Sequence, residues 1–271
     1  MNGKKKNNYA VVLRVALVLA VWFAIYKCYA AFAEPLFADR LPEMSVLILR
    51  SMVVPYTLGL GGCYLVIRGM ERLPTPGGLK ATPGLTLKAF IVQMGLSMPV
   101  IIIVNILCNM MGAGRVIMTA DMLFGKNRLF YFVLLLIFNP IFEELLFRKI
   151  SLDRLMVIGE VPAIIVSAVF FALPHIYSAG IPQFFGTFII ALVYAYLRVK
   201  TGRMWPVIVL HSLFNVYGCY FAIFMQSRVP TTGIFILLSI LILPITAVIL
   251  VVKHFKGNAV NNDYVYSKGV L

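Results

Sequence analysis

The chain has 271 residues, of which 61% are hydrophobic and 13% charged, and its mean hydropathy is +0.94. A soluble domain of this length cannot bury so much apolar surface, so the composition excludes a soluble protein and predicts a lipid environment. The net charge of +14 comes from basic residues scattered over short segments. It indicates membrane topology and contact with anionic lipid, and it gives no basic domain for nucleic-acid binding.

Apolar runs long enough to cross a hydrocarbon core of about 30 Å follow one another along the chain. They predict eight transmembrane helices, near residues 9–33, 46–67, 88–111, 129–149, 161–177, 182–199, 204–225 and 231–252. Helix is the expected structure because an uninterrupted apolar run satisfies its backbone hydrogen bonds internally, whereas a membrane strand alternates in character. We therefore expect an all-α, polytopic membrane helix bundle that forms one domain over residues 1–271.

The distribution of Lys and Arg predicts the orientation of the bundle, since cytoplasmic loops carry an excess of both. Basic residues expected on the cytoplasmic side are Lys4, Lys5, Lys6, Arg68, Arg72, Lys80, Arg148, Lys149, Arg154, Arg198, Lys200, Arg203, Lys253 and Lys256. The opposite side receives fewer, namely Arg40, Arg115, Lys126, Arg128 and Arg228. Both termini are therefore expected in the cytoplasm, and a bacterial plasma membrane is the expected location.

Three of the predicted spans carry a glutamate or a histidine, which cost free energy inside lipid and so indicate a function. The fourth span contains Glu143, Glu144 and Arg148 in the run NPIFEELLFRK. The fifth ends in FFALPHIY with His175, and the seventh contains HSLFN with His211 and Asn215. These six residues are the candidate catalytic residues.

The spacing of these residues predicts which of them share a helix face, and this suggests a role for each. Glu144 and Arg148 lie four residues apart and can pair on one helix face, whereas Glu143 is rotated by about 100° and can face another helix. A carboxylate that is free of the arginine can act as a general base for water, together with His175. His211 and Asn215 also lie on one face and can donate hydrogen bonds to a developing oxyanion.

Each of these residues also has a structural interpretation. A glutamate and an arginine four apart can form an ion pair that only stabilises the helix. An asparagine in a membrane helix commonly bonds a neighbouring helix, and a buried histidine can be held the same way. It is the occurrence of all six in one chain that favours a catalytic site.

Three motifs carry a resemblance to a known family. The chain has EExxxR at Glu143, Glu144 and Arg148, FxxxH at Phe171 and His175, and HxxxN at His211 and Asn215. In this order, on separate membrane helices, they resemble the CAAX protease and bacteriocin-processing family of intramembrane proteases, also called abortive-infection proteins. The resemblance covers residues 128–220, the expected catalytic core.

The resemblance implies an intramembrane endopeptidase in which Glu143 and His175 activate water while His211 and Asn215 stabilise the oxyanion. Eukaryotic members remove three terminal residues from prenylated CAAX proteins, whereas bacterial members are linked to peptide maturation, bacteriocin immunity or signalling. The expected partners are a peptide or membrane-protein substrate and membrane lipid, with no nucleic acid.

Two alternatives to this interpretation remain open. Glu143, His175 and His211 could hold a catalytic zinc ion, although the lack of an HExxH arrangement and the presence of Asn215 favour a mechanism without a cofactor. The chain could also be an ion-coupled transporter or a non-catalytic immunity or scaffold protein.

The depth of the candidate residues makes a further prediction. If the fourth span ended at Lys149, Glu143 would lie too near the cytoplasmic end to share a water molecule with His175. We therefore expect the fourth helix to continue to about Arg154, with an amphipathic end that protrudes on the cytoplasmic side.

Overall fold

The computed structural model describes residues 2–112 and 118–267 of the chain. Within these ranges the chain is helical and has no strand. Eight helices are long and apolar enough to cross a membrane: Asn8–Leu36, Glu43–Ile67, Pro83–Met110, Arg128–Ile158, Glu160–Tyr177, Ile181–Thr201, Trp205–Met225 and Val229–Lys256. The predicted class and number of spans are therefore confirmed. Arg115, assigned to the non-cytoplasmic side, lies outside the described residues.

Several spans are built from α-helical pieces that π-helical or 3-10 turns join into one continuous helix. The main α-helical pieces are α1 (Asn2–Cys28), α2 (Glu43–Ile48), α3 (Leu60–Ile67), α4 (Pro83–Met110), α5 (Ala120–Phe124), α6 (Arg128–Val133), α7 (Asn139–Glu144), α8 (Asp153–Leu155), α9 (Glu160–Ala179), α10 (Ile181–Thr201), α11 (Trp205–Asn215), α12 (Ala222–Met225), α13 (Val229–Leu237) and α14 (Leu243–Ser267). Thus α6, α7 and α8 belong to the fourth span, and α11 and α12 to the seventh.

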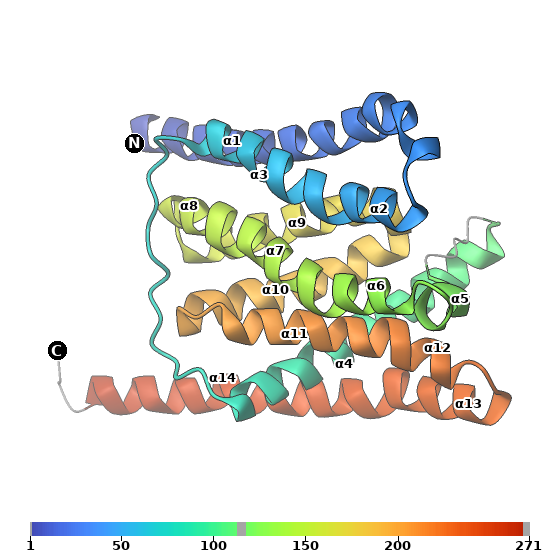
Figure 1. Cartoon of the computed structure of the whole chain (residues 1–271). Coiled ribbons are helices and arrows are strands. Elements are labelled where there is room, and N and C mark those ends of the chain that lie inside the picture. The colour runs from blue at the N-terminus through green and yellow to red at the C-terminus, as the bar shows by residue number, and fades with distance from the viewer. Residues whose placement is uncertain (1, 113–117, 268–271) are drawn as a thin grey trace.

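The spans lie roughly side by side, so the bundle has two ends (Figure 1). One end holds the start of α1, the end of α14 and the extended segment that joins α3 to α4; we call it the terminal end. The other end holds α5, the start of α6 and the turn between α12 and α13; we call it the distal end. In the middle, α10 packs against both α9 and α4, and α4 also packs against α14.

The fourth span is longer than its apolar run, since it continues from Arg128 to Ile158. The predicted extension beyond Lys149 is thus present. Its last part does not stand free, however, because Leu152, Asp153 and Leu155 are all buried. The two leucines pack with Val15 of α1 and with residues of α9 and α10 in one apolar cluster, so this end is part of the protein core.

An extended segment, residues 68–82, crosses the terminal end of the bundle (Figure 1). The amide of Leu73 donates to the Asp153 carbonyl (3.0 Å), and the amide of Leu79 donates to the Lys200 carbonyl (2.8 Å). The segment therefore ties the fourth and sixth spans together. Beneath it the Arg198 guanidinium pairs with the Asp153 carboxylate at 3.1 Å. Arg198, like Arg148, is buried within its span near the terminal end and is not exposed at the surface of that end.

Candidate active site

The centre of the candidate site is a buried ion pair on the fourth span. Arg148 Nε donates to Glu144 Oε2 at 3.0 Å, and both side chains are completely buried. Arg148 Nη1 also donates to Ser167 Oγ of α9 at 2.7 Å. The guanidinium lies 4.8 Å from the centre of the Phe171 ring, within cation–π range. The predicted pair at i and i+4 is thus formed, and it joins the fourth span to the fifth.

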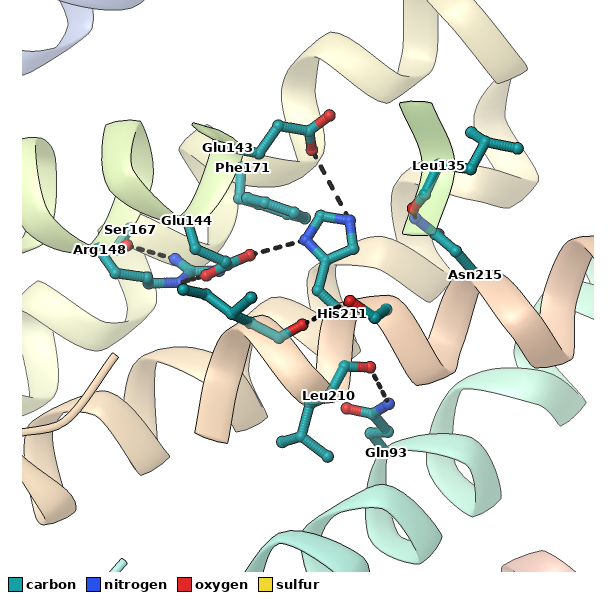
Figure 2. A network of polar contacts seen from close by, with 12 residues as sticks. Gln93, Leu135, Glu143, Glu144, Arg148, Ser167, Phe171, Leu210, His211 and Asn215 are labelled. Carbon is teal, nitrogen blue, oxygen red and sulfur yellow. Dashed lines mark hydrogen bonds and ion pairs between the residues drawn. The ribbon is translucent and has the colours of Figure 1, made fainter. Parts of the chain in front are cut away.

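Glu144 has a second partner, which comes from the seventh span. His211 Nδ1 donates to Glu144 Oε1 at 3.0 Å, so one carboxylate holds both a guanidinium and an imidazole (Figure 2). The other ring nitrogen of His211, Nε2, lies 3.9 Å from Glu143 Oε2. The ring stacks on Tyr194 of α10, with centroids 5.8 Å apart. His211 is therefore fixed on several sides, with Nε2 turned toward Glu143.

The two adjacent glutamates have different surroundings, as their rotation on the helix predicts. Glu144 is fully buried and engaged, whereas the Glu143 side chain keeps 18% of its surface exposed, in a cavity. Glu143 is thus separate from the Arg148 pair and accessible to a small molecule such as water.

His175 and Asn215 each make one hydrogen bond to a backbone carbonyl. His175 Nδ1 donates to the Phe171 carbonyl one turn earlier (3.0 Å), and the two rings stack with centroids 5.4 Å apart. Asn215 Nδ2 donates to the Leu135 carbonyl of the fourth span at 2.7 Å. Asn215 therefore bonds a neighbouring helix, as its structural interpretation expects, and retains a second amide hydrogen.

Pro140 explains why the fourth span has carbonyls to offer. A proline has no N–H, so it removes a backbone hydrogen bond from the preceding turn of a helix. The carbonyl of Leu136, four residues before Pro140, instead accepts from Ser212 Oγ at 2.8 Å, and Leu135 accepts from Asn215. In membrane helices such freed carbonyls must find partners within the protein. The seventh span supplies them, which aligns it with the fourth.

A cavity of about 710 Å³ brings the candidate residues together. Its walls include Glu143, His175, His211 and Asn215, and further lining comes from aromatic side chains such as Tyr56 and Phe171. Volumes of this order accommodate several residues of a peptide or a drug-sized ligand. Glu144 and Arg148 are not part of this wall; they lie behind it and hold His211.

The sequence reasoning missed three polar contributors. Ser167 bonds Arg148, and Tyr194 stacks on His211. Gln93 of α4, fully buried in the third span, donates from Nε2 to the Leu210 carbonyl at 3.2 Å (Figure 2). A glutamine inside a membrane helix is a signal that could have been used, because buried amides there require partners.

The alternative zinc site is not supported by the arrangement of donors. Among the described residues, no group of three or more His, Cys, Asp or Glu side chains is placed to hold a metal ion. Glu143, His175 and His211 thus line one cavity without forming such a group. The nitrogen Nδ1 of each histidine bonds the protein, at Phe171 and Glu144 respectively, an arrangement that metal-bound and metal-free histidines share, so it is the placement of the donors that does not support a zinc site.

Comparison with known proteins identifies a family for the segment that contains the site. Residues 125–217 match a family model described as Type II CAAX prenyl endopeptidase Rce1-like, and this segment contains all six candidate residues. No curated protein and no solved structure gives a significant match. The predicted resemblance to the CAAX protease family is confirmed: at residues 125–217 the chain carries an Rce1-like domain of the type II CAAX prenyl endopeptidase family.

Proposed function

We propose that this protein is an intramembrane endopeptidase that hydrolyses a peptide bond with a water molecule activated by Glu143. The observation that carries the proposal is that the two adjacent glutamates have different surroundings. Glu144 is fully buried between Arg148 and His211, while Glu143 faces the cavity 3.9 Å from His211 Nε2. A base and a hydrogen-bond donor therefore lie side by side at the cavity wall, where both can reach a carbonyl group bound in the cavity.

In the proposed reaction, Glu143 takes a proton from water and the resulting hydroxide attacks the carbonyl carbon. His175 helps to orient that water, because a neutral imidazole that donates from Nδ1 to Phe171 keeps Nε2 as an acceptor. The oxyanion accepts hydrogen bonds from His211 Nε2–H and from the second amide hydrogen of Asn215. Glu143 then delivers its proton to the leaving nitrogen, and the C–N bond breaks.

The charges of the cluster fit this assignment. For His211 to donate from both nitrogens it must be an imidazolium. The carboxylates of Glu143 and Glu144 then balance Arg148 and His211, so the four groups carry no net charge. A cluster that is neutral as a whole is the least costly way to keep ionised groups within a membrane.

The proposed substrate is a peptide or a segment of a membrane protein. The family description names a CAAX prenyl endopeptidase, whereas the cavity wall combines aromatic and aliphatic side chains with amides and hydroxyls, a lining that suits apolar peptide side chains as well as a prenyl group. The proposal therefore rests on a peptide bond and requires no prenyl group.

The test is cleavage of quenched peptides, both prenylated and unmodified, by purified protein in detergent. We expect the wild type to cleave, and Glu143→Gln and His175→Ala to lose activity by at least about 100-fold. Glu160→Gln serves as the matched control, because Glu160 is a carboxylate at the start of α9 that pairs with Lys200. It should retain activity.

Peptidase activity measured in the presence of a chelator distinguishes the glutamate mechanism from a zinc mechanism. Activity retained in chelator supports the glutamate mechanism, whereas activity lost in chelator and restored by zinc would contradict it. Equal activity of Glu143→Gln and wild type would refute the assignment of the base. If the wild type cleaves no peptide and ion flux depends on Glu143, the protein is a carrier.

A further inference from the structure

The cavity that contains Glu143 extends from the middle of the bundle in one direction. On the fourth, fifth and seventh spans its lining residues fall within 134–147, 171–177 and 211–226, and on the sixth within 183–194. Each of these ranges reaches from near the middle of its span toward the distal end. The cavity thus runs from Glu143 toward the distal end of the bundle.

The opposite direction, toward the terminal end, is filled by packed side chains. Behind Glu143 lie Glu144 and Arg148, both completely buried. Beyond them Leu152 and Leu155 are also completely buried, in the cluster that joins the fourth span to α1 and α10. The extended segment 68–82 then covers this end and bonds the fourth and sixth spans. A peptide cannot reach Glu143 from there without unpacking the core.

The mouth of the cavity is marked by exposed residues that also belong to its lining. Arg50 has 44% of its side-chain surface exposed and pairs with the buried carboxylate of Glu34. Tyr177 at the end of α9 is 57% exposed, and Gln226, just after α12, is exposed as well. These positions lie in the second span, in the fifth span and just after the seventh, and all are near the distal end.

The basic residues indicate which side of the membrane this is. Those at the terminal end include Lys4, Lys5, Lys6, Arg68, Arg72, Lys80, Arg154, Lys200, Arg203, Lys253 and Lys256, whereas the described residues at the distal end include Lys27, Arg40, Arg50, Lys126, Arg128 and Arg228. Because the side richer in Lys and Arg faces the cytoplasm, the distal end faces away from it.

We propose that the site takes its substrate from the extracytoplasmic side: a peptide segment that is exported, or that a membrane protein exposes at its outer surface. This inference rests on the proposed function and names its substrate class. Arg50 lies six residues before Tyr56, whose ring contacts Phe142 at 5.1 Å beside Glu143. Six helical residues span about 9 Å, which an extended peptide covers with about three residues. The bond that is cleaved therefore lies a few residues inside the mouth.

Cys219 provides a native reporter, because its thiol lines the cavity and forms no disulfide. In a chain with Cys28, Cys63 and Cys108 replaced by alanine, Cys219 is the single thiol. A membrane-impermeant maleimide is added to intact spheroplasts of an expression host and, separately, to inverted membrane vesicles. Lys80→Cys is the matched control for the terminal end, because Lys80 is exposed in the segment 68–82; this chain also carries Cys219→Ala.

We expect Cys219 to be labelled at least about tenfold faster in spheroplasts than in inverted vesicles, with the reverse for Lys80→Cys. Gln183→Cys, at the start of α10, serves as a second reporter of the cavity mouth should the first set of replacements reduce expression. Labelling of Cys219 or Gln183→Cys only in inverted vesicles, or in neither preparation, would overturn the proposal.

Labelling requires no catalysis, so this result is independent of the proposed function. A quenched peptide that spheroplasts cleave from the outside, and that Glu143→Gln spheroplasts do not, links the two. A protein labelled from outside that cleaves no peptide would leave the direction of the cavity supported and refute the peptidase assignment alone.

Discussion

Replacing Arg148 by methionine tests whether the buried ion pair behind the cavity positions His211. The guanidinium has two polar contacts, Glu144 at 3.0 Å and Ser167 at 2.7 Å, and its removal takes both away. Methionine fills much of the volume but leaves the Glu144 carboxylate buried with His211 as its remaining partner. Loss of one member of a buried pair typically costs about 3–5 kcal/mol of unfolding free energy. We expect a loss in this range.

The effect on catalysis should be larger than the loss of stability explains. If the pair fixes Glu144, and Glu144 fixes His211, the peptidase rate of folded Arg148→Met protein should fall about 100-fold or more, as when one oxyanion donor is removed. Arg198→Met is the matched control, because Arg198 is also buried and pairs with Asp153 at 3.1 Å, away from the cavity. It should lose stability and keep its rate.

The assay combines unfolding in a titration with sodium dodecyl sulfate and peptide cleavage measured where the variant is still folded. The double variant Glu144→Gln with Arg148→Met removes both charges and should unfold at a higher denaturant fraction than the sum of the single effects predicts. A loss below about 1 kcal/mol for Arg148→Met would refute the reasoning, given the size expected for a buried charge. So would equal losses of rate in Arg148→Met and Arg198→Met.

Two further changes probe the packing around the site. Ser167→Ala leaves a buried guanidinium N–H of Arg148 without its partner and should reduce the unfolding free energy by about 1–3 kcal/mol in the same titration; an unchanged midpoint would argue against this bond. Gly95→Ala should destabilise the protein strongly, because an added Cβ would clash with the Leu243 carbonyl oxygen of α14. Gly84→Ala is the control: a Cβ at Gly84 would have no atom within 4 Å, so this variant should be neutral or stabilising. Equal midpoints for the two variants would show that α4 and α14 pack less closely.

The fold was largely predictable because lipid imposes one pattern. Each apolar run had to become a helix, and the predicted ends of most spans lie within a few residues of those observed. The fourth span continues past its apolar run to Ile158, and only the depth of Glu143, not hydropathy, predicted an extension to about Arg154. There the last turns carry Arg148 and Asp153, which polarity alone would assign to a loop. They are buried because each finds a partner, Glu144 and Arg198 respectively.

Within the site, contacts between residues close in sequence could be predicted, whereas contacts between different spans could not. Spacing was enough to predict that Glu144 faces Arg148, which is a contact between successive turns of one helix. It could not predict that Glu144 also binds His211, 67 positions away, or that Ser167 completes the pair. Such contacts depend on how the spans are rotated and shifted against each other, and no local periodicity determines that.

One local signal does bear on this alignment, and it is Pro140. The proline leaves carbonyls of the preceding turn without their helical donors, and in lipid these must be satisfied by another span. Ser212 and Asn215 of the seventh span bond the carbonyls of Leu136 and Leu135. Because His211 is adjacent to Ser212, the same two bonds set the height at which His211 meets Glu144. The six-residue run NPIFEE therefore contains both Pro140, which frees the carbonyls that bond the seventh span, and Glu143, the candidate base. The HSLFN run contains the residues that bond those carbonyls and also His211.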